Sequence, residues 1–148
     1  MKASEGRLSP FQPLADDDGL DVLFFDKVSG HCVAIQLKCR TVTLKKPKSE
    51  ERGDGVHFEV RKATFNEGRR AYLVAALLNE ELTHFVSTWF MPLALLPQIA
   101  RNAADKWVIR PSKSLTSADR FIGYRCMTDA ELAMRIVQLC EAQSAPLI

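Results

Sequence analysis

The sequence predicts an α+β domain in which a run of mostly antiparallel strands precedes the helices. Residues 71–78 are continuously apolar, as in a central strand, and residues 56–61 alternate between apolar and polar side chains, as in a half-buried strand. Near the C-terminus, Thr128 and Glu131 have the spacing of a capping box, and a helical pattern of apolar residues follows them. This order, with the strands first and a helix with a clear capping pattern last, is expected of an α+β domain.

One domain accounts for the whole chain. It has 148 residues, of which 47% are hydrophobic and 26% charged, and this is enough to bury a core without disulfides or metals. No repeat or low-complexity segment divides it, so we expect a single domain over 1–148. The net charge of +2 is too balanced to indicate nucleic acid by bulk charge, so such a partner requires a local basic patch.

The first half of the chain is predicted to contain a β-hairpin. Pro10 and Pro13 restrict a strand near the N-terminus to an edge or irregular position. A turn signal at Ser29 and Gly30 separates two runs that are rich in β-forming residues. In chain order, the expected elements are an extended segment over 7–14, an acidic turn over 16–19, strands over 20–26 and 32–38, and a long polar loop over 40–55.

The second half is predicted to complete the sheet and to add the helices. Pro92 and Pro97 suit the first turn of a helix better than its interior. In chain order, the expected elements are strands over 56–61, 71–78 and 83–91, a helix within 93–104, a short strand over 106–110, and a final helix after Thr128.

We expect no secretory signal, because no apolar stretch follows Met1 and Lys2. The longest apolar runs are too short to span a bilayer. The four cysteines form no CxxC pair and have no zinc-ligand spacing with the histidines, so we expect reduced thiols. These features predict a cytoplasmic protein without a membrane partner.

The second strand of the hairpin carries a polar pair on one face. Val33, Ile35 and Leu37 share the apolar face, because side chains alternate along a strand. Gln36 and Lys38 therefore stand side by side on the other face.

The first strand of the hairpin brings Asp21 to this polar pair. A two-residue turn at Ser29 and Gly30 pairs position 21 with position 38, and a turn centred one residue earlier pairs it with position 36. Either register puts the Asp21 side chain on the face of Gln36 and Lys38, within cross-strand reach. A three-residue loop would put it on the other face.

An acid, an amide oxygen and a lysine on one sheet face suit metal-dependent hydrolysis of a phosphodiester bond. Asp21 offers a hard anionic oxygen to Mg²⁺ or Mn²⁺, and Gln36 or a strand carbonyl offers a second one. The metal would polarise the phosphoryl oxygen and lower the pKa of the attacking water. Lys38 would orient that water or neutralise charge that develops in the transition state.

These residues resemble the motifs of the PD-(D/E)XK nuclease superfamily. The letters G-L-D end at Asp21, and Q-L-K begins at Gln36 after 14 intervening residues, at the end of an apolar strand. Bacterial members whose motifs read G-[IL]-D and Q-x-K are the most similar. The resemblance implies a restriction-endonuclease-like fold, with a mixed, mostly antiparallel central sheet flanked by helices. It also implies that Asp21 and Gln36 bind the metal and that Lys38 is the catalytic lysine.

Two features of the chain differ from the family pattern. Gln36 stands where an acid is commoner, which leaves the site one negative charge poorer. The first family helix, which often carries a Glu, is expected to be absent or to lie upstream of Met1. The alternative function is therefore a catalytically inactive nuclease-like domain that acts as a nucleic-acid-binding or protein-assembly module.

Five basic residues without an acid lie at or beside the candidate site and could follow a phosphate backbone. They are Lys38, Arg40, Lys45, Lys46 and Lys48. A solvated loop explains the same run, and a solvated turn explains the acidic residues 16–18. Likewise, Asp21 could be an ordinary residue at the start of a strand, with Gln36 and Lys38 on a solvated sheet face.

The resemblance implies nucleic acid as the partner, with DNA the first expectation. Many nuclease-like domains act as dimers, so a homodimer is consistent with the resemblance. No residue pattern in the sequence identifies an interface.

Overall fold

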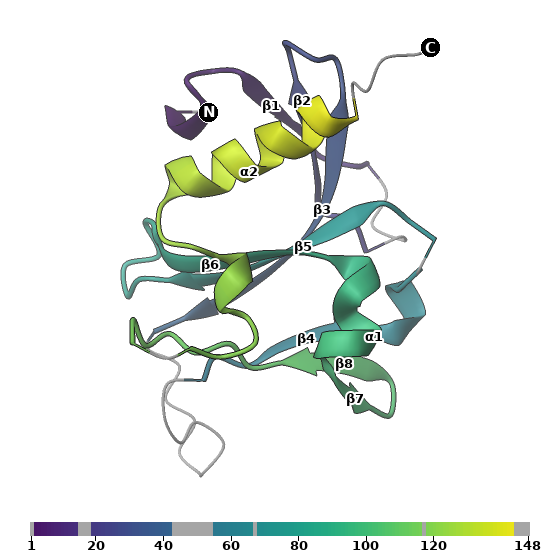
Figure 1. Ribbon diagram of the computed structural model, residues 1–148, viewed down its shortest axis with the longest axis vertical. Coiled ribbons are helices and arrows are strands. Elements are labelled where there is room, and N and C mark those ends of the chain that lie inside the picture. Colours follow the sequence, from purple (N-terminus) through teal and green to yellow (C-terminus); the bar gives the residue numbers. More distant parts are fainter. Residues whose placement is uncertain (1, 15–18, 43–54, 67, 117, 144–148) are drawn as a thin grey trace.

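The computed structural model describes residues 2–14, 19–42, 55–66, 68–116 and 118–143, and its strands form two sheets (Figure 1). The strands of the six-stranded sheet are, in spatial order, β1 (Leu8–Phe11), β2 (Val22–Asp26), β3 (Cys32–Thr41), β5 (Ala71–Leu78), β6 (Phe85–Pro92) and β9 (Arg125–Cys126). Those of the three-stranded sheet are β4 (Phe58–Arg61), β8 (Lys106–Ile109) and β7 (Arg101–Ala103). The α-helices are α1 (Leu96–Ile99) and α2 (Asp129–Ala142), and short 3₁₀ turns span Lys2–Ser4, Lys62–Thr64, Leu93–Leu95 and Ile122–Tyr124.

The larger sheet is mixed and mostly antiparallel, as the sequence predicts. β3 and β5 run parallel, in a register that extends from Ala34 beside Ala71 to Thr41 beside Leu78. The other described pairs of neighbouring strands in this sheet are antiparallel. β5 lies in the middle of the sheet and is buried over 73–77, which explains its continuous apolar run.

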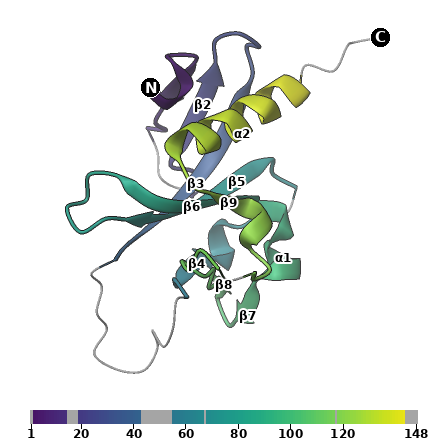
Figure 2. The same cartoon turned by 60° about the vertical axis from the view of Figure 1, so that its left-hand side comes forward.

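Different layers cover the two faces of the larger sheet (Figures 1 and 2). Helix α2 covers one face, where Ile136 and Ile35 belong to the same buried cluster. The smaller sheet and α1 cover the other face, where the rings of Phe58 and Trp89 lie 6.0 Å apart between centroids. The expectation of a sheet flanked by helices is therefore confirmed, and the second sheet that accompanies α1 is an addition to it.

The β2–β3 hairpin adopts one of the two registers that the sequence allows. Val22 lies opposite Ile35, and this register centres the turn on residues 28 and 29. Asp21, the next residue toward the N-terminus, donates its N–H to the carbonyl of Ile35, so it lies beside β3 at the residue that precedes Gln36 in that strand. The hairpin therefore brings the predicted acid beside the predicted polar pair.

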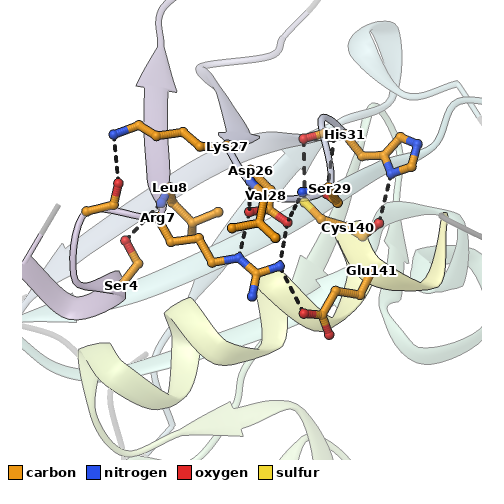
Figure 3. A network of polar contacts seen from close by, with 11 residues as sticks. Ser4, Arg7, Leu8, Asp26, Lys27, Val28, Ser29, His31, Cys140 and Glu141 are labelled. Carbon is orange, nitrogen blue, oxygen red and sulfur yellow. Dashed lines mark hydrogen bonds and ion pairs between the residues drawn. The ribbon is translucent and has the colours of Figure 1, made fainter.

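The buried carboxylate of Asp26 connects the tip of this hairpin to β1 and to α2 (Figure 3). Arg7 donates to both of its oxygens, at 2.6 and 2.8 Å, and to Glu141 of α2 at 2.9 Å. The Asp26 oxygens also accept the main-chain N–H groups of Val28 and Ser29, at 3.1 and 3.3 Å. The hydrogen-bonded guanidinium of Arg7 outweighs the effect of burial and holds the pKa of the Asp26 carboxyl well below its usual range.

The polar loop begins later than its composition predicts. We expected it from Arg40, but β3 continues to Thr41 because its last residues pair with β5. The stretch 43–54 and the acidic turn over 16–18 lie outside the described residues.

The helix expected within 93–104 is shorter than predicted. A 3₁₀ turn leads into α1, which ends at Ile99, and the next residues form β7 because they pair with β8. The final helix begins where its capping box predicts. Thr128 Oγ1 accepts the N–H of Glu131 at 3.1 Å, and the Glu131 carboxylate accepts the N–H of Met127 at 2.9 Å. In the described part of the chain, no helix is long and apolar enough to cross a membrane.

Candidate functional site

Asp21 precedes β2 and is fixed to the main chain of β3. Its N–H donates to the carbonyl of Ile35 at 2.9 Å, and its Oδ2 accepts the N–H of Leu37 at 2.6 Å. The carboxylate thus takes the place that a main-chain carbonyl usually has in a strand ladder. This hydrogen bond therefore holds the acid against the stretch of β3 that also carries Gln36 and Lys38.

The second oxygen of the Asp21 carboxylate, Oδ1, accepts no hydrogen bond from any other residue that the structure describes, and the side chain is exposed. One oxygen is therefore used to position the group. The other is open to a ligand from solvent.

Gln36 is buried, with only 4% of its surface exposed. It lies beside Leu73 of β5, on the sheet face that the smaller sheet covers. Its side-chain amide forms no hydrogen bond with another described residue, although a buried amide usually has a partner. The interpretation of Gln36 as part of a solvated sheet face is therefore wrong.

Gly19 lies close to both Thr64 and the Gln36 amide. Gly19 has a φ of +69°, and a Cβ built on it would lie 2.7 Å from Thr64 Cβ and 3.2 Å from Gln36 Nε2. A side chain at position 19 would therefore collide with Thr64, at the end of the 3₁₀ turn that follows β4. The sequence marks Gly19 as a turn residue, but it has no signal for the approach of Thr64.

Lys38 is half-buried beside Ala75 of β5. It occupies the same face of β3 as Gln36, because the two residues are separated by one position. Its ammonium forms no ion pair with another described residue. The structure thus gathers Asp21, Gln36 and Lys38 along one short stretch of hairpin.

The described residues provide one carboxylate at this site. They contain no group of three or more His, Cys, Asp or Glu side chains that could hold a metal ion. A divalent ion here would use the open oxygen of Asp21 and the amide oxygen of Gln36, and it would keep water as its other ligands. That donor set fits Mg²⁺ or Mn²⁺, because Mg²⁺ takes one or two carboxylates in proteins and retains several waters.

The basic residues of the predicted nucleic-acid surface have different positions. Arg40 Nε donates to the carbonyl of His57 at 2.9 Å and so connects β3 to the start of β4. Lys45, Lys46 and Lys48 lie outside the described residues. Beside Arg40, the hydrogen bond from His57 and the ion pair with Lys106 lower the pKa of Glu59 to about 2.

No protein-family model and no curated protein sequence matches this chain. A solved structure of similar fold is the bacterial homing endonuclease I-Ssp6803I, with a TM-score of 0.60 and 20% sequence identity over 99% of this chain and 90% of that one. The chain has the restriction-endonuclease-like fold. The Holliday junction resolvase Hjc of Archaeoglobus fulgidus is less similar, with a TM-score of 0.39 and 14% identity over 74% of this chain and 79% of that one.

The fold that the motif resemblance implied is thereby confirmed. Within the restriction-endonuclease-like fold, the residues that carry the resemblance lie together on β3 and on the residue that leads into β2. Their roles as ligands and as a catalytic group remain predictions.

Proposed function

We propose that this protein is a metal-dependent nuclease that hydrolyses phosphodiester bonds in nucleic acid, with DNA the favoured substrate. The observation that carries the proposal is the hydrogen bond from Leu37 to Asp21, which holds a carboxylate against the stretch of β3 that carries Gln36 and Lys38. The restriction-endonuclease-like fold supports it, because I-Ssp6803I is an endonuclease. A nuclease of this kind needs an acid, a second oxygen ligand and a cation near one phosphate.

Asp21 and Gln36 would hold the divalent ion, Mg²⁺ or Mn²⁺. The chemistry that such an ion supplies is polarisation of the phosphoryl group and activation of water at neutral pH. The main-chain N–H of Leu37 orients the carboxylate of Asp21. The close approach of Gly19 limits the space around the amide of Gln36.

Lys38 would act on the phosphate and on the attacking water. Lys38 is half-buried, and its ammonium has no carboxylate partner among the described residues. Its positive charge would therefore stabilise the negative charge that develops in the transition state. The rigid pairing of β3 with β5 fixes the backbone from which Lys38 extends. A fixed cation contributes more than a flexible one, because no reorganisation is needed during the reaction.

The nucleic acid would lie along the basic residues that follow the site. Lys38 and Arg40 project from one face of β3, and Lys45, Lys46 and Lys48 follow them in the sequence. Cations of this kind bind phosphates without reading the base sequence. We therefore expect weak sequence preference from this surface and strong dependence of binding on salt.

Replacement of Asp21 by Asn tests the enzyme directly. Asn retains an oxygen for the Leu37 N–H but removes the negative charge, so the fold should persist while metal binding fails. Titration of Mn²⁺ and Mg²⁺ by calorimetry, followed by incubation with plasmid and with single-stranded nucleic acid, should show binding and cleavage only in the wild type. Asp105→Asn is the matched control, because Asp105 is exposed and its side chain has no described partner. A wild type that neither binds metal nor cleaves would rule out the enzyme.

The second candidate function is a nuclease-like domain without activity, which binds nucleic acid or assembles with protein. It is favoured by the lone carboxylate of the described site. In that case the wild type would bind nucleic acid in gel-shift experiments and leave it intact in the presence of Mn²⁺. A homodimer and a cytoplasmic location complete the proposal, and sedimentation velocity and cell fractionation measure them.

A further inference from the structure

A small cavity lies at the far end of β3 from the hairpin tip. Its volume is about 50 Å³, and its described lining contains two cations, Arg40 and Lys113, and no acid. The remaining lining residues are Thr41, Val42, Gly55, Val56 and Leu77. Two positive side chains that converge on one hollow repel each other unless an anion lies between them.

A hydrogen bond at one side of the Arg40 guanidinium holds this side chain in place. Nε donates to the carbonyl of His57, whereas its two terminal nitrogens donate to no other described residue. The planar group is therefore held at Nε, and no described residue accepts from its two terminal nitrogens. Arginine in this state suits a phosphate, because two parallel N–H groups match two phosphate oxygens.

Lys113 comes from a loop that Arg125 holds in place. Arg125 donates to the carbonyls of Lys113 and Ser114 at 2.9 and 2.8 Å, and to the buried hydroxyl of Ser87 at 2.9 Å. Its guanidinium also lies 5.7 Å from the centre of the Trp89 ring. The loop is thus anchored to the core, while the Lys113 ammonium is exposed and has no described acidic partner.

The cavity is aligned with the candidate active site. Gln36, Lys38 and Arg40 occupy alternate positions of β3 and so share one face. At about 3.3 Å per residue, Arg40 lies about 13 Å along the strand from Gln36. One strand of duplex DNA carries a phosphate per about 3.4 Å of helix axis, so a bound strand can reach both places within a few nucleotides.

We propose that this cavity binds a backbone phosphate of the nucleic acid whose cleavage is proposed above. Arg40 provides hydrogen-bond donors held by its Nε contact, and Lys113 provides a point charge from another segment of the lining. Bound there, one phosphate sets the position of the strand, and a phosphate further along reaches Asp21 and Lys38. The cavity reads no base, so it contributes affinity and register rather than sequence preference. This inference rests on the proposed function.

Lys113→Gln tests the cavity with little risk to folding, because the side chain is exposed and has no described partner. Binding to a short labelled DNA duplex is measured by fluorescence anisotropy in EDTA, so that cleavage does not interfere. We expect affinity to fall about threefold to tenfold, and the slope of log K against log salt to become shallower by about one, which is the loss of one phosphate contact. Lys113→Arg should restore both values.

Lys27→Gln is the matched control. Lys27 is an exposed lysine at the hairpin tip, at the other end of β3, and its ammonium donates to the carbonyl of Gly6. The Lys27→Gln substitution removes one positive charge, as Lys113→Gln does, but it leaves the cavity intact. Duplex binding and salt dependence should match the wild type, and an equal loss in both variants would overturn the cavity as a specific site.

Inorganic phosphate is the second probe, and it separates the two proposals. Phosphate added to the wild type should shift the NMR amide signals of residues 112–114, and Lys113→Gln should abolish the shift. If phosphate produces the shift but Lys113→Gln binds duplex as the wild type does, the cavity is a site for free phosphate and the inference is wrong. If Asp21→Asn still cleaves DNA, the proposed active site fails, whereas the binding results for Lys113 stand.

Discussion

The carboxylate of Asp21 accepts the N–H of Leu37 at 2.6 Å, so the candidate acid is bound to the strand that carries the other two candidate residues. One hydrogen bond therefore couples the geometry of the site to the pairing of β2 with β3. A change in hairpin register would move Gln36 and Lys38 away from Asp21 at the same time. The fold and the proposed chemistry depend on the same contact.

Asp21→Ala should lower stability, whereas Asp21→Asn should not. Alanine leaves the N–H of Leu37 without its acceptor and should cost about 1 kcal/mol in the free energy of unfolding. Asparagine retains an acceptor oxygen at the same place. Urea denaturation of the three proteins measures the difference, and equal midpoints for Asp21→Ala and the wild type would show that this hydrogen bond contributes nothing to the hairpin.

Gly19→Ala should damage both stability and metal binding. A left-handed φ costs an alanine about 1 kcal/mol, and the collision with Thr64 Cβ should add about 1–3 kcal/mol and displace Gln36. Urea denaturation measures the stability, and Mn²⁺ titration measures the state of the site.

Gly30→Ala is the control for Gly19→Ala. Gly30 has a φ of +75° on the same hairpin, but a Cβ there would meet no described atom within 4 Å. Gly30→Ala should lose only the free energy that an alanine costs at a left-handed φ. It should bind Mn²⁺ as the wild type does. The double change Gly19→Ala with Thr64→Gly should recover part of the metal affinity. If Gly30→Ala loses metal binding to the same extent, Gly19 has no special role in holding Gln36.

The hairpin shows how far local sequence patterns reach. Alternation of side chains predicts Asp21, Gln36 and Lys38 on one face, and the turn signal leaves two registers open. In the observed register the side chain of Asp26 accepts two N–H groups in the turn and pairs with Arg7 of another segment, and these contacts stabilise this register. A long-range ion pair of this kind leaves no mark in the local pattern.

Tertiary pairing also explains the elements that sequence patterns missed. Arg40 and Thr41 are polar and precede turn-forming residues, yet parallel pairing with β5 keeps them in a strand. The segment Arg101–Ala103 is too short to have a recognisable period, and it becomes a strand only through β8. The contact between Gly19 and Thr64 joins two turns from different parts of the chain. Each feature depends on a partner that is distant in sequence.

The ion pair between Arg7 and Asp26 should make stability fall in acid. The folded protein holds the pKa of Asp26 below its ordinary value of 3.8, so the pair contributes its full stabilisation above that value. As the pH falls below about 4, the unfolded chain takes up a proton first, and the stabilisation decreases. The cluster formed by Glu59, His57 and Lys106 acts in the same direction, but it is more exposed and contributes less.

Asp26→Asn should make the free energy of unfolding fall less steeply as the pH is lowered. At neutral pH the variant should lose about 2–3 kcal/mol, because it removes a buried charge that accepts several hydrogen bonds. Its free energy of unfolding should then approach that of the wild type as the pH falls toward 2. Thermal or urea denaturation at a series of pH values checks both points, and parallel curves for the two proteins would show that Asp26 does not carry the acid dependence.

Arg125→Lys should loosen the loop that presents Lys113. A lysine retains the positive charge but cannot donate at once to Ser87, Ser114 and the Lys113 carbonyl, because it lacks the planar fork of the guanidinium. We expect a loss of about 2 kcal/mol in the free energy of unfolding and weaker duplex binding in EDTA. Arg120→Lys is the control, since among the described residues the Arg120 side chain donates one hydrogen bond, to the Ile99 carbonyl at 3.3 Å. If Arg125→Lys is destabilised but binds duplex with the wild-type affinity and salt slope, the loop does not need to be rigid for Lys113 to act.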